Sequence, residues 1–146
     1  IARCVVFKAD VVAQDKTESR GVRECLNYGH TLAHAIEKLS GYGTYSHGHA
    51  VAEGMRFAAR MGMRLADMPA ELAQAQAQLL DDLDLPELDW EASPAQVLDV
   101  MKRDKKARRG QVRFVCLQDV GQWQLQDVAD GVILEELEAY FAQKRR

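Results

Sequence analysis

Apolar residues at helical spacing run through most of the 146-residue chain, and turn residues divide that pattern into short segments. In the first segment, Val5, Val6, Ala9 and Val12 recur at intervals of three or four residues. The polar run at residues 15–21 then interrupts the pattern, and glycine or proline marks several of the later breaks. The chain is therefore predicted to fold into a set of short packed helices.

The predicted helices cover residues 1–14, 23–39, 49–66, 69–82, 94–103 and 130–142, and Asp130 is expected to cap the last one. Gly54 and Gly62 fall inside the third helix, where they predict close packing against another element. The run at residues 112–117 is rich in β-formers and is expected to pair with residues 123–125 as a hairpin. The predicted fold class is mostly α, a multi-helix domain spanning residues 1–146 with one small β-hairpin.

Composition sets limits on the partners of the chain. Its 47% hydrophobic and 28% charged residues are typical of a soluble globular protein, and its net charge of −3 favours neither nucleic acid nor an anionic membrane. Basic residues are dense only at residues 102–109, and this short run does not change the overall negative charge of the chain. Cys4, Cys25 and Cys116 form no CxxC pair, so we expect buried, reduced thiols in a cytoplasmic protein. Neither a signal peptide nor a membrane span is indicated.

All four histidines lie between residues 30 and 49. His30 and His34 are four residues apart on a predicted helix, so they share one face. The Gly41–Gly43 turn lets the chain double back and bring His47 or His49 to that face. Such a group suits a divalent metal ion such as zinc, although the same histidines could instead fill polar gaps in a helix interface. The HExxH glutamate is absent, so a metalloprotease is not indicated.

A polar stripe accompanies the histidines. Arg23, Asn27, His30 and His34 recur at helical spacing and offer few apolar atoms to bury, which predicts the wall of a polar pocket. An arginine there suits a phosphate or carboxylate, and an asparagine suits a hydroxyl. Glu37 lies one turn further on, where it could orient an imidazole or remain a solvated surface charge.

These residues form motifs that resemble those of the 3-dehydroquinate synthases. The resemblance is carried by KADVV at residues 8–12, LNYGHTLAHAIE at 26–37, GYG at 41–43 with HG at 47–48 and GM at 54–55, and DKK at 104–106 with RFV at 113–115. It covers essentially the whole chain.

The resemblance implies a function and a wider architecture. Enzymes of this family convert 3-deoxy-D-arabino-heptulosonate 7-phosphate into 3-dehydroquinate and phosphate in the shikimate pathway, using NAD and a divalent metal, Zn²⁺ or Co²⁺. The chain would then be the C-terminal domain of a cytoplasmic two-domain enzyme, a homodimer when full-length. Because it opens on Ile1, we expect the NAD-binding half to be absent and the fragment alone to be inactive.

The resemblance also implies roles for individual residues. His30 and His47 match metal ligands, and His34 matches a catalytic histidine next to the substrate phosphate. Several cationic and amide side chains match residues that contact the substrate in this family: Lys8, Arg23, Asn27 and one of Lys105 and Lys106.

The chain departs from the family pattern at three places. The third metal ligand of the family is a glutamate upstream of Ile1, His49 stands where the family usually has glutamate, and the loop at residues 18–23 is one residue longer. Three other hypotheses about the function of the chain remain open. They are a related cyclase acting on sedoheptulose 7-phosphate or glucose 6-phosphate, a non-catalytic metal sensor or store, and a purely structural helical domain.

Overall fold

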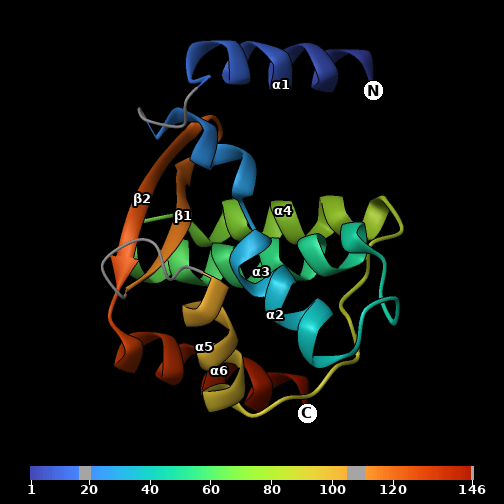
Figure 1. Cartoon of the computed structure of the whole chain (residues 1–146), viewed down its shortest axis with the longest axis vertical. Helices are drawn as coiled ribbons and strands as arrows, with labels where there is room; N and C mark the ends of the chain where they lie inside the picture. The colour runs from blue at the N-terminus through green and yellow to red at the C-terminus, as the bar shows by residue number, and fades with distance from the viewer. Residues whose placement is uncertain (17–20, 105–110, 146) are drawn as a thin grey trace.

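The computed structural model describes residues 1–16, 21–104 and 111–145. Its elements, in chain order, are α1 (Ala2–Gln14), the 3₁₀ helix η1 (Val22–Asn27), α2 (His30–Leu39), α3 (His47–Leu65), α4 (Ala70–Asp82), α5 (Pro94–Asp104), β1 (Val112–Asp119), β2 (Gln122–Val128) and α6 (Asp130–Lys144). The predicted mostly α fold with one small β-hairpin is confirmed. Figure 1 shows α1 at one end of the molecule and α5 and α6 at the other.

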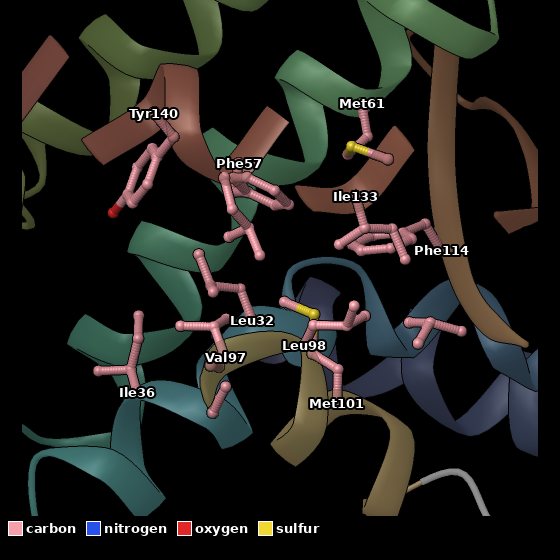
Figure 2. Packing of buried hydrophobic residues seen from close by; sticks show 14 of the residues in the cluster. Leu32, Ile36, Phe57, Met61, Val97, Leu98, Met101, Phe114, Ile133 and Tyr140 are labelled. Carbon is pink, nitrogen blue, oxygen red and sulfur yellow. The ribbon is translucent and has the colours of Figure 1, made fainter. Parts of the chain in front are cut away.

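The hydrophobic core is centred on the pair α2 and α3. Leu32 from α2 and Phe57 from α3 are almost fully buried, and Phe114 from β1 packs 6.1 Å from Phe57 between ring centroids. Side chains of α5 and α6 complete the core, and Figure 2 shows Ile133 of α6 next to Met61 and Phe114, and Met101 of α5 next to Leu98. Burial of these apolar surfaces against one another fixes how α2 and α3 lie.

The predicted single helix over residues 23–39 is wrong. The chain forms η1, turns at Tyr28 and Gly29, and only then enters α2. Gly29 has φ 81°, a left-handed conformation that ends one helix before the next begins. The residues before and after this break both recur at helical spacing, so the sequence pattern does not indicate where the helix is interrupted.

The expected close packing of Gly54 is confirmed. A Cβ atom on Gly54 would lie 1.9 Å from the carbonyl oxygen of Gly29, so the two backbones touch. A Cβ on Gly62 would likewise lie 3.1 Å from the carbonyl oxygen of Leu117, which brings β1 against the end of α3. The glycines of α3 therefore give two other elements direct access to its surface.

The β-hairpin holds η1 and the start of α2 in place. β1 and β2 pair antiparallel from Val112 opposite Val128 onwards. The Arg113 guanidinium contacts Asp127 of β2 at 2.6 Å and Glu24 of η1 at 3.6 Å. Thr31 of α2 donates its hydroxyl to the Arg113 carbonyl oxygen at 3.2 Å. The hairpin thus fastens two segments that precede it by some 80 residues in the chain.

Two further expectations about helix ends and burial need correction. Asp130 is the first residue of α6 rather than its cap, because Ala129 holds the N-cap position and the Asp130 carboxylate accepts a hydrogen bond from Lys102 at 2.5 Å. Cys116 is buried as expected, but Cys25 is half-buried and Cys4 is exposed. Cys4 is exposed because it lies on α1, which contacts the rest of the molecule mainly at η1.

Helix α1 carries apolar residues that the described chain does not cover. Val5, Val6 and Phe7 are each about 60% exposed, whereas Val11, near the end next to η1, is buried. Across the described residues, no helix combines the length and the apolar character that crossing a membrane would require.

Candidate metal and substrate site

Two imidazoles meet where α2 and α3 begin. His30 is the first residue of α2, directly after the left-handed Gly29, and His47 is the first residue of α3. Their ring centroids are 5.3 Å apart. The contact between Gly29 and Gly54 brings the start of α2 against α3, so the proximity of the rings is built into the packing of the backbone.

Hydrogen bonds at Nδ1 orient both rings. His30 donates from Nδ1 to the Tyr28 carbonyl oxygen at 3.2 Å, because a carbonyl can only accept. His47 donates from Nδ1 to Glu37 Oε1 at 2.9 Å. In the neutral tautomer each ring then keeps its lone pair on Nε2, which is the atom a metal ion would take. Of the two expectations for Glu37, contact with an imidazole is the one observed.

Partial burial favours the neutral form of His30. Desolvation lowers the pKa of His30 below its ordinary value, and the neighbouring His34 and His47 lower it further. The lowered pKa favours the neutral ring, which is the form that binds a metal ion.

The other two histidines occupy different positions. His34 is exposed on α2, one turn after His30, and its ring centroid lies 5.8 Å from that of His30. His49 lies one helical turn beyond the N-cap residue Ser46, and its Nδ1 is 2.6 Å from the Ser46 hydroxyl. The described residues show no ring contact between His49 and another imidazole. His49 is thus engaged at the start of α3 rather than in the cluster.

The donor set fits part of a metal site. Two adjacent imidazoles with Nε2 available are suitable zinc or cobalt ligands. Within residues 1–16, 21–104 and 111–145, no group of three His, Cys, Asp or Glu side chains is placed to hold an ion. The geometry therefore matches two ligands of a site that needs at least one more.

A polar cavity adjoins His30. It has a volume of about 230 Å³ and is lined by the predicted substrate-binding residues Lys8, Arg23 and Asn27 together with His30, and by Asp15, Glu24 and Leu26. The predicted stripe along one helix is wrong, but the turn at Gly29 still brings Arg23 and Asn27 of η1 beside His30. Lys105 and Lys106 lie outside the described residues.

Residues that sequence reasoning missed support this cavity and the turn beside it. Asp15 is buried and accepts a hydrogen bond from the Arg23 backbone nitrogen at 3.4 Å, which ties the end of α1 to η1. Tyr28 donates its hydroxyl to Gln76 Oε1 at 2.7 Å, and Gln76 donates to the Met55 carbonyl oxygen at 3.0 Å. No local pattern indicates that Gln76, on α4, anchors the turn that orients His30.

Comparison with known proteins places the chain in a family. Residues 1–107 match the family described as 3-dehydroquinate synthase C-terminal. A 3-dehydroquinate synthase of Acaryochloris marina is 42% identical over 135 residues, which cover 92% of this chain and 36% of that protein. The chain therefore belongs to the 3-dehydroquinate synthase C-terminal family, and it spans little more than a third of the length of the curated relatives it matches.

Solved structures share the fold. One is a 2-deoxy-scyllo-inosose synthase complexed with carbaglucose-6-phosphate, NAD⁺ and Co²⁺, with a TM-score of 0.77 and 27% identity over 92% of this chain and 38% of that one. Another is a 2-epi-5-epi-valiolone synthase from Streptomyces hygroscopicus with NAD⁺ and Zn²⁺ bound. Its TM-score is 0.81 over 97% of this chain and 39% of that one, and its 17% identity makes it a likeness of fold.

Proposed function

We propose that this chain is the metal- and substrate-binding C-terminal domain of a 3-dehydroquinate synthase, which converts 3-deoxy-D-arabino-heptulosonate 7-phosphate into 3-dehydroquinate and phosphate. The observation that carries the proposal is the position of the paired imidazoles of His30 and His47 beside a cavity lined by Lys8, Arg23 and Asn27. Family membership and the motifs of residues 26–37 support the same assignment.

In this proposal His30 and His47 are two of the metal ligands. Glu37 and the Tyr28 carbonyl hold the two rings through Nδ1 and so leave each Nε2 available for a metal ion. A Zn²⁺ or Co²⁺ ion held by these ligands would supply Lewis acidity, which lowers the pKa of a substrate hydroxyl. The remaining ligand would come from the longer polypeptide to which the relatives correspond.

The cationic cavity residues bind the anionic substrate. Lys8 and Arg23 offer positive charge to its phosphate and carboxylate groups, and Asn27 offers donor and acceptor atoms to a hydroxyl. The two carboxylates of the same wall are already engaged, since Glu24 faces Arg113 at 3.6 Å and Asp15 accepts from the Arg23 amide. Positive charge that is already in position before the reaction begins stabilises the leaving phosphate group.

His34 is the proposed proton-transfer residue. Its exposed ring stands beside His30, so it can reach a substrate held at the metal without being a ligand itself. A histidine titrates near neutrality and can therefore carry a proton to or from the phosphate end of the substrate. One of Lys105 and Lys106 is proposed as a further substrate contact.

The same proposal assigns NAD mainly to the remainder of the full-length enzyme, which we propose is a cytoplasmic homodimer. The 146 residues alone would then bind metal weakly and lack activity. A metal sensor or store would instead need a complete ligand set within the chain, and among the described residues no three His, Cys, Asp or Glu side chains are placed to hold an ion. Sedimentation of the full-length protein tests the dimer.

Product analysis tests the proposed reaction. The full-length polypeptide that contains this chain is incubated with NAD, Zn²⁺ or Co²⁺, and 3-deoxy-D-arabino-heptulosonate 7-phosphate, with sedoheptulose 7-phosphate and glucose 6-phosphate as parallel substrates. We expect 3-dehydroquinate and phosphate from the first substrate. Cyclisation of one of the other sugar phosphates in its place would reject the assignment in favour of a related cyclase.

A further inference from the structure

A tight turn connects η1 to α2 and carries the first of the two proposed metal ligands. Tyr28 has φ −56° and ψ 125°, and Gly29 has φ 81° and ψ −18°. These angles define a type II β-turn, whose third residue needs a positive φ and is therefore usually glycine. The turn spans residues 27–30, and His30 is its last residue. Because a type II turn has defined backbone angles, these four residues move together as one unit.

The His30 ring belongs to the same unit. Its Nδ1 donates to the Tyr28 carbonyl oxygen at 3.2 Å, so the ring is bonded back onto the turn. The position of this ring relative to His47, which opens α3, therefore depends on how the turn is fastened to α3. Any shift of the turn along α3 would move His30 and leave His47 in place.

The backbone of the turn provides one attachment to α3. Gly29 lies so close to this helix that a Cβ on it would be 2.8 Å from the Val51 carbonyl oxygen and 2.8 Å from the Met55 amide nitrogen. The Gly29 carbonyl oxygen fills the space beside Gly54. These contacts are made by a single residue of the turn, and van der Waals contact has little directional preference. They do not by themselves prevent the turn from rotating about Gly29.

Tyr28 provides a second attachment, which is directional. Its hydroxyl donates to Gln76 Oε1 at 2.7 Å, and Gln76 Nε2 donates to the Met55 carbonyl oxygen of α3 at 3.0 Å. A carbonyl oxygen only accepts, so Met55 determines which end of the Gln76 amide faces it and which end faces Tyr28. One side chain of α4 thus ties the turn to α3. Two attachment points fix an orientation that one point leaves variable.

We propose that Tyr28 and Gln76 are positioning residues, which hold His30 in the place where it can share a metal ion with His47. Neither side chain is itself a ligand, and both act through the turn. This inference rests on the proposed role of the two histidines as metal ligands. It extends the site to α4, a helix that carries none of the proposed ligands or substrate contacts. Removal of the tie then lowers metal affinity although both imidazoles remain.

Co²⁺ titration of the full-length polypeptide tests the proposal, with visible absorption as the readout. Tyr28→Phe removes the donor of the tie, and Gln76→Met replaces the amide with an apolar side chain of similar length. We expect each variant to bind Co²⁺ about fivefold more weakly, because the loss is limited to about the net free energy of one hydrogen bond. The double variant should bind no more weakly than the weaker single variant, since both changes break the same tie. The spectrum of bound Co²⁺ at saturation should also change, because it reports ligand geometry.

Two controls separate positioning from a general loss of stability. Gln78→Leu removes an exposed hydrogen bond to Asp82 on the same helix as Gln76. Ile133→Val trims a fully buried side chain of α6, and it should destabilise the fold about as much as the loss of the tie does. Both control variants should bind Co²⁺ within about twofold of the unchanged polypeptide and give the same spectrum, because they lie outside the site.

The outcomes distinguish the positioning role from the proposed metal site. Unchanged Co²⁺ affinity and spectrum in either the Tyr28 or the Gln76 variant would overturn the positioning role and leave the metal site in place. An equal loss of affinity in Ile133→Val would also overturn it, since the effect would then follow stability alone. A lack of Co²⁺ binding by the unchanged polypeptide would instead reject the metal site, and the positioning role with it.

Discussion

The carbonyl oxygen of Gly29 occupies the space where a side chain on Gly54 would begin, 1.9 Å from the position of its Cβ. Because Gly29 precedes His30 and Gly54 lies on the helix that His47 opens, this contact sets the distance between the two imidazoles. The metal site proposed for the chain therefore depends on backbone packing as much as on the histidines themselves.

Gly54→Ala should destabilise the fold. The added methyl group has no room against the Gly29 carbonyl, and overpacking of this kind costs about 1–3 kcal/mol or more. The free energy of unfolding in urea measures the effect. Gly131→Ala is the control, because a Cβ at Gly131 in α6 meets nothing within 4 Å, and we expect an unchanged or slightly higher stability. Equal effects of the two substitutions would contradict the close packing.

Tyr28 and Gln76 should be energetically coupled. Tyr28→Phe removes the hydroxyl that bonds to Gln76, and Gln76→Leu removes both that acceptor and the donor to Met55. Each change should cost about 1 kcal/mol, with the double mutant costing less than the sum. Gln78→Leu, which loses an exposed bond to Asp82 on the same helix, should change stability little. Strict additivity of the Tyr28 and Gln76 changes would argue against a shared hydrogen bond.

Tyr140 should make the fold less stable at alkaline pH. Burial and the neighbouring Glu53 raise the pKa of Tyr140 above its ordinary value of 10.0. Above that pH the unfolded chain releases this proton and the folded chain retains it, so the free energy of unfolding falls as pH rises. Urea titrations from pH 8 to 11 should show a shallower decline in Tyr140→Phe, whereas exposed Tyr42→Phe should keep the original slope. An unchanged slope in Tyr140→Phe would contradict the account.

Glu37→Gln should weaken metal binding in the full-length polypeptide. The carboxylate accepts from His47 Nδ1 at 2.9 Å and so orients the ring. Loss of such a partner typically lowers metal affinity about 10- to 100-fold. Glu71→Gln, in the first turn of α4, is a matched charge control and should leave the affinity unchanged. Equal affinities of the two variants would remove Glu37 from the site.

Much of the architecture could be predicted from the sequence because helical periodicity and turn residues are local signals. The helices near Pro69 and Ser93–Pro94 and the hairpin from Val112 were predicted within a few residues of their observed bounds. The break at Gly29 was not predictable in this way, since the spacing of Arg23, Asn27 and His30 also suits a continuous helix. The reason for the break is the contact with Gly54, which is a property of the packed structure.

The candidate site could also be predicted only in part from the sequence. The clustering of His30, His34 and His47 was predictable from their short separation and from the Gly41–Gly43 turn, where Gly41 and Gly43 adopt φ 83° and 95°. The residues that hold the rings were harder to predict. Gln76 reaches Tyr28 across 48 positions, and no pattern in either segment indicates the pairing.

His30 and His47 are proposed to bind the same ion, and Co²⁺ titration of the full-length polypeptide tests this most directly. Visible absorption of bound Co²⁺ gives affinity and stoichiometry for the unchanged protein and for His30→Ala, His47→Ala and His49→Ala. We expect one ion per chain and a loss of more than about tenfold in affinity for each of the first two variants, with the His49 variant unaffected. Full Co²⁺ affinity in either the His30 or the His47 variant would contradict the account.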